Sequence, residues 1–576
     1  MESCFTSLYA RQACIFFERD NAVQKADIII ENATVRTMDP ARPGAQSLAI
    51  SGDRILAVGA REDVAACRGE GTRTVNAGGA TVLPGFIESH MHIFPGGAQL
   101  DRLSLAGLPD PEAVAKAVRE RAATEPGDGL ILAEQAHYAT LGDGVAMTRQ
   151  LLDQILPDRP LALYAGDHHT MWANTAALEA AGLLEGAEAP AGCEVVMGND
   201  GLAGGELREF EAFSPVLAMT ANGGRDGNGL ASGRALPKDP TAEERARDRE
   251  TIEAGLAYCA SLGITSFHNM DADPHQLDIL GEIDGDGKMP CRAYMPLRML
   301  PGHPLSDFQK AVADRQRYAS AHLKCGFVKM FMDGVIEATT AFMLDDYGDK
   351  PGVRGAPLFE EEEFQAFCVE ADRLGLQIAV HAIGDAAVRR TLDGYAAARK
   401  ANGARDSRHR IEHIETLDPA DLPRFQELGV VASMQPTHAP GAYFPFEPSA
   451  SLIGRKRMAL AFAWQQLREA GARLCFASDW PVAPLDPLMG IKTALTRKPA
   501  FDGAPDERQS LDDTLAAFTR DGAWVEFAEN EKGMLCPGML ADIVVLTGDI
   551  NKTPADEVDG LAVAMTLCGG KVTYAR

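Results

Sequence analysis

Two histidines end an apolar run near the start of the chain. Residues 82–94 read VLPGFIESHMHIF, so His90 and His92 stand two positions apart. Side chains of a β-strand alternate between its two faces, so both imidazoles point the same way if the strand continues through them. An isolated His-x-His at a loop rim would carry no function. The rest of the chain decides between the two interpretations.

Four later apolar runs each contain one residue that could bind a metal ion: Lys329, His381, His413 and Asp479. Imidazole nitrogens and carboxylate oxygens suit borderline cations such as Zn²⁺, and a position left open for water makes such a site catalytic. A lysine inside an apolar run costs several kcal/mol unless it is paired or neutral. Lys329 could therefore form an ion pair with Asp333 or Glu337. Alternatively, its neutral amine could react with carbon dioxide, giving a carbamate whose two oxygens each bind a metal.

The runs that carry these residues predict a parallel α/β barrel. Short apolar segments, mostly separated by helical stretches, recur at 264–269, 291–297, 326–334, 377–385, 409–415, 430–436 and 473–481. With the strand that leads into His90 they make eight βα units, the number in a TIM (β/α)8 barrel. Barrel enzymes build their active sites at the C-terminal ends of the strands, where the candidate ligands stand. The set predicts two divalent cations, most simply Zn²⁺.

Both ends of the chain have the alternating pattern of short antiparallel strands between Gly, Asn and Asp turns. We expect residues 24–84 and 530–576 to form one small β-sandwich domain, and residues 85–529 to form the barrel domain. Residues 98–255 are too long for one crossover and contain strands of their own. They predict an insertion after the first barrel strand that covers the barrel mouth.

Composition narrows the class of protein. The 576 residues are 46% hydrophobic and 24% charged, and the net charge of −27 is spread without long blocks of one sign. This argues against binding to nucleic acid or to an anionic membrane. No run approaches the ~18 apolar residues of a membrane helix, and residues 1–20 lack the unbroken apolar core of a secretory signal. The 11 cysteines form no Cys-x-x-Cys pair, which is typical of reduced thiols in a cytoplasmic protein.

The motifs PGFIESHMH, KMFMDG, VHAIGD, RIEHIE, FASDWP and PGMLADIVVL together resemble the amidohydrolase superfamily. The likeness is to its family 3 branch of YtcJ-like proteins and N-substituted formamide deformylases, and it runs from about residue 25 to the end. The resemblance implies that His90 and His92 bind a first metal with Asp479. It also implies that His381 and His413 bind a second metal, and that carboxylated Lys329 bridges the two.

The resemblance also extends to an H-x-x-W-x-N motif in the insertion, matched by His169, Trp172 and Asn174. In the family, this motif lies near the substrate; the alternative is a packed corner between a strand and a helix. His268, after the second barrel strand, and His438, after the seventh, could orient the substrate or stabilise an oxyanion. Structural histidines are the alternative for both.

Departures from the family pattern bear on the substrate. Thr339 and Ala386 stand where the family often has arginine, which makes a doubly anionic substrate less favourable. Ala477 and Trp480 replace residues of the common G-S-D-A-P motif, and Trp480 could form an apolar wall beside the metals.

These features predict a hydrolase for the C–N bond of a small-molecule amide, either an N-acyl, N-formyl or aryl amide. Asp479 would act as the proton shuttle for a metal-bound hydroxide. Two alternatives stay open: the same site could attack a cyclic amide, carbamate or ester, or the protein could bind metal and ligand without catalysis. A homodimer is expected from the resemblance alone.

Overall fold

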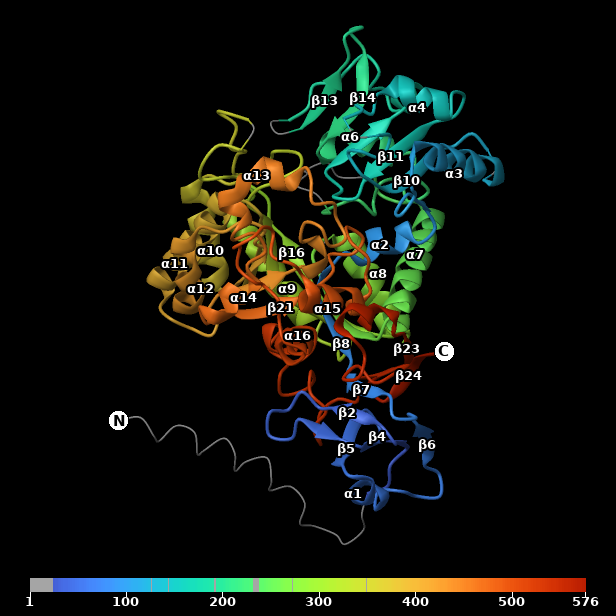
Figure 1. Ribbon diagram of the computed structural model, residues 1–576, viewed down its shortest axis with the longest axis vertical. Coiled ribbons are helices and arrows are strands. Elements are labelled where there is room, and N and C mark those ends of the chain that lie inside the picture. Colours follow the sequence, from blue (N-terminus) through green and yellow to red (C-terminus); the bar gives the residue numbers. More distant parts are fainter. Residues whose placement is uncertain are drawn as a thin grey trace.

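The structure is a computed structural model that describes residues 24–125, 127–142, 144–190, 193–230, 238–271, 273–348 and 350–576. Two of the cysteines, Cys4 and Cys14, lie outside these ranges. So do residues 1–20, for which the sequence predicts no secretory signal. The chain forms three parts, with a barrel in the centre (Figure 1). An inserted sheet lies above the barrel in this view, and sheets made from the two ends of the chain lie below it.

The central part is the predicted TIM barrel. Its eight neighbouring parallel strands are β8 (Phe86–Met91), β15 (Ile264–Asn269), β16 (Arg292–Arg298), β17 (Leu323–Phe331), β18 (Gln377–Ala382), β19 (Arg410–His413), β20 (Val431–Met434) and β21 (Arg473–Phe476). The first and last strands meet through the backbone just beyond their ends. The amide of Asp479 donates to the carbonyl of His90 at 2.9 Å, and the amide of His92 donates to the carbonyl of Trp480 at 2.8 Å. The mixed α/β fold with eight barrel strands is therefore confirmed.

Strand register sets the candidate ligands beside one another. Lys329 stands opposite Ala379, and Phe331 stands opposite His381. On the next pair, Ala382 stands opposite His413. The small Ala379 next to Lys329 leaves room inside the barrel for the longer side chain.

Amphipathic helices cover the outside of the barrel. They include α8 (Pro274–Gly285), α9 (Phe308–Arg317), α10 (Glu361–Arg373), α11 (Asp385–Asn402), α12 (Leu422–Leu428), α14 (Trp464–Glu469), α15 (Pro487–Thr496) and α16 (Leu511–Ala517). Local sequence explains their ends: Asp273 caps α8 by accepting from the amide of His275, and α10 begins with three glutamates and has Arg373 in its last turn. Both arrangements complement the helix dipole or its free amides. Their apolar faces join the largest buried cluster of the protein.

The segment after β8 forms its own sheet, as expected. Its strands, in spatial order, are β13 (Glu194–Met197), β14 (Ala203–Arg208), β12 (Thr170–Ala173), β11 (Leu161–Ala165), β10 (Ile131–Ala136) and β9 (Leu103–Ser104). Helices α3 (Pro111–Thr124), α4 (Arg149–Ile155), α5 (Thr175–Ala180) and α6 (Phe210–Leu217) pack around it. Helix α7 (Ala242–Ser261) already lies on the barrel, against α2 (Ile93–Gln99), where Gly97 and Gly255 allow the two backbones to touch.

The two ends of the chain meet in one region, as the strand pattern predicts. One sheet has the order β24-β23-β22-β7-β2-β3 and so combines both ends. Its strands are β24 (Lys571–Ala575), β23 (Val563–Cys568), β22 (Ile543–Leu546), β7 (Thr81–Pro84), β2 (Thr34–Arg36) and β3 (Gly44–Ala45). The other sheet consists of β5 (Arg54–Gly59), β4 (Ser47–Ser51), β1 (Ile28–Glu31) and β6 (Arg73–Asn76). The two sheets share an apolar core. The exact domain boundaries given above stay a prediction.

Within the described ranges, every helix is too short or too polar to reach across a bilayer.

Candidate metal centre and active-site cavity

All six predicted metal ligands line one cavity of about 530 Å³ at the C-terminal ends of the barrel strands. They come from β8, β17, β18 and β19 and from the loops after β8 and β21. Three of the imidazoles touch in a row: the ring centroids of His90 and His413 are 4.8 Å apart, and those of His413 and His381 are 4.5 Å apart. Residues that are hundreds of positions apart thus form one cluster.

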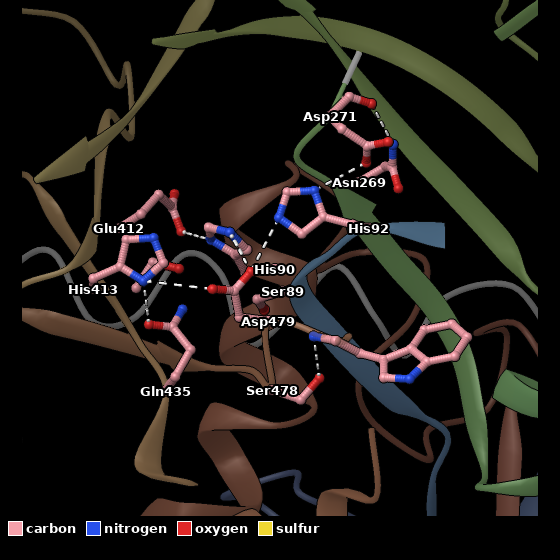
Figure 2. A network of polar contacts seen from close by, with 12 residues as sticks. Ser89, His90, His92, Asn269, Asp271, Glu412, His413, Gln435, Ser478 and Asp479 are labelled. Atoms are coloured by element: carbon pink, nitrogen blue, oxygen red, sulfur yellow. Dashed lines mark hydrogen bonds and ion pairs between the residues drawn. The ribbon is translucent and has the colours of Figure 1, made fainter. Parts of the chain in front are cut away.

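Asp479 lies at the centre of this cluster (Figure 2). Its Oδ1 is 3.1 Å from Nε2 of His90 and 3.0 Å from Nε2 of His92, and its Oδ2 is 3.9 Å from Nδ1 of His413. Asp479 has a positive φ of 62°, which aims its side chain back over the strand ends. Burial favours the neutral acid, but the surrounding imidazoles, His90 foremost, hold the pKa of Asp479 well below its ordinary value. The carboxylate is therefore ionised.

Lys329 is completely buried, and its Nζ contacts no hydrogen-bonding partner among the described residues. The ion pair with Asp333 or Glu337 considered above is not formed. Asp333 instead accepts hydrogen bonds from the amides of Phe342, Ile383 and Gly384. Burial lowers the pKa of Lys329 to about 8, so the amine readily gives up its proton. The carbamate alternative needs the neutral form of this amine, and it stays a prediction.

Polar groups behind the imidazoles orient them. Nδ1 of His90 is 2.7 Å from Glu412, Nδ1 of His92 is 3.1 Å from Asp271, and Nδ1 of His413 is 3.0 Å from the amide oxygen of Gln435. For His90 and His92 these contacts fix the proton on Nδ1 and turn Nε2 toward Asp479. Such an acceptor behind each ring is the usual support of a metal-binding histidine.

The donor set fits a divalent cation. Ligand atoms of His90, His92 and Asp479 all lie within 4.8 Å of one another, and a second group of the same size consists of His413, Glu415 and His438. Oδ1 of Asp479 is buried and accepts no hydrogen bond within the described part of the chain, although two ring nitrogens stand about 3 Å away. An acceptor oriented in this way needs a ligand such as a metal. Sequence reasoning missed Glu415, which the second glutamate of RIEHIE could have indicated.

A buried charged network fills the barrel beneath the ligands. Glu412 pairs with Arg410, and Arg410 is 2.9 Å from Nδ1 of His268. Nε2 of His268 is 3.5 Å from Glu526, and Glu526 pairs with Lys532 at 2.7 Å. We name this chain from Glu412 to Lys532 the floor network. Arg410 and Glu412 are two positions apart on β19, a spacing that puts both side chains inside the barrel.

Two of the six residues predicted near the substrate, His169 and His438, line the cavity. Nδ1 of His169 is 2.9 Å from Glu209. Although burial opposes protonation, Glu209 raises the pKa of His169 to about 9, so this imidazole is a cation. Nε2 of His438 is 3.1 Å from the carbonyl oxygen of Ser478.

The other four residues predicted near the substrate are not among the residues that line the cavity. His268 is completely buried within the floor network. Trp172 packs against Tyr138 in the core of the insertion, and Asn174 caps α5, so this part of the motif is a packed corner. Trp480 is also buried, covering Gly96 and contacting Tyr258. Its ring therefore supports the loop of Asp479 from behind instead of forming an apolar wall beside the site.

Carboxylates and aromatic rings make up the outer part of the cavity. The carboxylates are Asp167, Glu337, Glu415 and Glu447, and the rings are Tyr138, Phe331 and Phe444. Glu337 was considered only as an ion-pair partner of Lys329, and none of these positions was predicted from the sequence as a substrate contact. They follow strands on different parts of the chain, and no local pattern links them.

The fold and the site define a barrel enzyme whose histidine and carboxylate residues gather at the mouth of the barrel. A family model described as "Amidohydrolase family" matches residues 73–574. The chain therefore belongs to the amidohydrolase family, as its motifs indicate, and it is a hydrolase that acts on carbon–nitrogen bonds.

Two relatives and one solved structure illustrate the similarity. The chain is 32% identical to Protein LONG AFTER FAR-RED 3 of Arabidopsis thaliana, over 95% of this chain and 92% of that protein. It is 26% identical to N-substituted formamide deformylase of Arthrobacter pascens, over 96% of this chain and 99% of that protein. An uncharacterized metal-dependent hydrolase from Pyrococcus horikoshii has the same fold, with a TM-score of 0.71 and 23% identity over 92% of this chain and 99% of that one.

Proposed function

We propose that this protein is a metal-dependent amidohydrolase that cleaves the C–N bond of a small linear amide, either an N-formyl, N-acyl or aryl amide. The observation that carries the proposal is the position of Asp479. One ionised carboxylate faces three imidazoles at the bottom of a cavity large enough for a small molecule. The similarity to an N-substituted formamide deformylase supports the choice of a linear amide.

His90, His92 and Asp479 would hold one divalent ion, and His381 and His413 would hold a second, with carboxylated Lys329 between them. Zn²⁺ is the cation that this set of nitrogen and oxygen donors suits best. When bound, such ions lower the pKa of water and polarise a carbonyl group.

Side chains of the protein accept and donate the protons of the reaction. Asp479 accepts the proton that the attacking water loses, and it then donates this proton to the amide nitrogen. This transfer matters because an amine leaves poorly unless it is protonated. His169 is protonated and uses Nδ1 for Glu209, so its Nε2–H can donate to the substrate carbonyl oxygen as negative charge develops there.

The test is a substrate panel with chelated and metal-restored enzyme. It contains formamides, acyl-anilides, cyclic amides and esters, and metal content is measured in parallel. We expect turnover of a linear amide that chelation removes and added Zn²⁺ restores. Preference for a cyclic amide or an ester would favour the alternative substrate class, and metal binding without any turnover would favour a binding protein.

The variant Asp479→Asn tests the proton role. We expect turnover to fall about 10²–10⁴-fold, because an amide cannot accept the proton. The bound metal is measured in the same preparation. Turnover near that of the unmodified enzyme would contradict the assigned role, whatever the metal content.

A further inference from the structure

Three carboxylates line the same cavity as the six predicted metal ligands: Asp167, Glu337 and Glu415. Asp167 follows β11 of the insertion, Glu337 follows β17 of the barrel, and Glu415 follows β19. They act on one another electrostatically, since Glu415 and Asp167 both disfavour the charged form of Glu337. The substrate must pass or occupy this space on its way to Asp479.

Within the described residues, no lysine or arginine pairs with any of these three carboxylates within 4 Å. Glu337 accepts a hydrogen bond from the hydroxyl of Ser449. Asp167 accepts one from Tyr138 at 3.0 Å and one from the amide of His169 at 2.9 Å. These neutral donors solvate a carboxylate but do not balance its charge.

The nearby histidines do not balance all three charges. His169 is already paired with Glu209 at 2.9 Å, and His438 stands 3.9 Å from Glu415. Glu337 in particular forms no ion pair with a described residue, and no cation is among the causes of its pKa shift. Burial, with Glu415 as the next cause, raises the pKa of Glu337 to about 7, and burial also raises the pKa of Asp167. The three carboxylates are partly shielded from water, and shielded charges are normally paired, so we expect the missing partner to come from outside the chain.

Other features of the cavity also point to a ligand. Nζ of Lys329 and Oδ1 of Asp479 are buried, belong to residues that line the same space and form no hydrogen bond within the described ranges. The rings of Tyr138, Phe331 and Phe444 line its walls, and aromatic faces attract a cation. Lys329 is the single lysine or arginine among the described lining residues, and it lies at the bottom of the cavity with the candidate metal ligands.

We propose that the substrate carries a cationic group, such as an alkylammonium, that binds at Glu337 and Asp167 while its amide lies beside Asp479. This inference rests on the proposed amide hydrolysis, and it specifies the charge of the substrate. The carboxylates of the cavity supply the anionic partner, and the aromatic rings enclose the alkyl chain. An anionic substrate would meet repulsion from the same groups.

Three formamides of matched length test the charge preference: N-(aminopentyl)formamide, N-hexylformamide and N-formylaminohexanoate. They end in an ammonium, a methyl group and a carboxylate. With metal-loaded enzyme we expect kcat/KM to be at least about 10-fold higher for the ammonium compound than for the methyl compound, and lowest for the carboxylate, because a charge-assisted hydrogen bond is gained only with the first. Equal values, or a preference for the methyl or carboxylate compound, would overturn the proposal.

The variant Glu337→Gln keeps the shape of the side chain and removes its charge. We expect it to reduce kcat/KM for the ammonium compound about 10–100-fold and to change the value for the methyl compound less than about 2-fold. Asp167→Asn should act in the same direction. Glu362→Gln, an exposed glutamate of α10, is the matched control and should leave the ratio unchanged. A uniform loss for all three compounds in Glu337→Gln would overturn the proposal.

Calorimetric binding separates a failure of this inference from a failure of the proposed function. If no formamide is hydrolysed, amide hydrolysis is contradicted for this acyl group, but binding of the same three compounds is still measurable. Tighter binding of the ammonium compound that Glu337→Gln weakens would support the charge preference without turnover. Equal binding of all three, or no difference between the enzyme and Glu337→Gln, would reject it.

Discussion

The floor network consists of largely buried charges and the outer cavity of partly exposed carboxylates, and the two regions balance their charge in opposite ways. Beneath the ligands, Arg410 pairs with Glu412, and Lys532 pairs with Glu526. Above the ligands, the hydrogen bonds that Glu337 and Asp167 accept from described residues come from hydroxyl and amide groups. A network whose charges are paired internally holds a structure in place. A region whose carboxylates remain unpaired can instead bind a cationic ligand, which is the role we propose for the outer cavity.

The difference appears in the pKa values of two glutamates, the completely buried Glu412 and the partly exposed Glu337. Burial raises the pKa of both, but Arg410 and His90 reverse the effect for Glu412 and hold its pKa far below the ordinary value. Glu337 lacks such partners, and its pKa rises to about 7. The same residue type is thus a fixed anion in one region and a titrating group in the other.

The largest effect is expected from breaking the floor network at Arg410. The change Arg410→Met leaves Glu412 as a completely buried carboxylate without its guanidinium. We expect the free energy of unfolding to fall by about 3–5 kcal/mol, measured by urea denaturation. Metal affinity should also fall about 10–100-fold, because Glu412 orients His90. Unchanged stability would show that the network is not the rigid support we describe.

A double variant that removes both charges of the Arg410–Glu412 pair separates the effect on stability from the effect on metal binding. In the double variant Arg410→Met/Glu412→Met, no buried charge is left unpaired, so the stability should return most of the way to that of the unmodified protein. Metal affinity should stay low, because Nδ1 of His90 still lacks its acceptor. Recovery of both properties together would contradict a role of Glu412 in orienting His90.

In the outer cavity, we expect the removal of a charge to cause little loss of stability. Removing the charge of Glu337 with Glu337→Gln should leave the free energy of unfolding within about 1 kcal/mol of the original value or raise it, because an unpaired carboxylate is lost. A loss as large as that of Arg410→Met would mean that Glu337 serves the fold. The two variants are compared in the same denaturation experiment.

A pH titration gives a smaller effect. Glu337 gains its charge as the pH rises through about 7, so binding of N-(aminopentyl)formamide should strengthen over that range, up to about 10-fold. The groups that act on Glu337 are Glu415, Asp167, Tyr138 and Tyr347, with Ser449 as hydrogen-bond donor. Binding of N-hexylformamide should not change in this way. In Glu337→Gln the pH dependence of ammonium binding should disappear, and its persistence would assign it to another group.

The smallest effect is expected at Trp172, which belongs to neither region. The change Trp172→Phe keeps an aromatic ring in the core of the insertion, so kcat/KM for each formamide should change less than about 2-fold, with a stability loss of up to about 2 kcal/mol. A change of kcat/KM for one compound alone would indicate that Trp172 contacts the substrate.

The sequence by itself determined the eight strands, the joining of the two ends and the six residues expected to bind metal. Each of these features can be recognised in a short stretch of sequence. The signals are an apolar run, an alternation of apolar and polar residues, or a metal-binding residue type at the end of a strand. Their convergence followed from one rule, that parallel barrel strands end on the same side. The motif resemblance then indicated the same family that the comparison shows.

Only the tertiary structure decided which side chains are partners. Trp172, His268 and Trp480 stand close in sequence to site residues, yet the strand alternation, the packing of the insertion and the turn at Asp479 direct them into the core. Lys329 could equally have paired with Asp333 or Glu337 on the basis of sequence. Pairing of buried charges depends on a few ångströms between residues far apart in the chain, and no periodicity of the sequence records such distances.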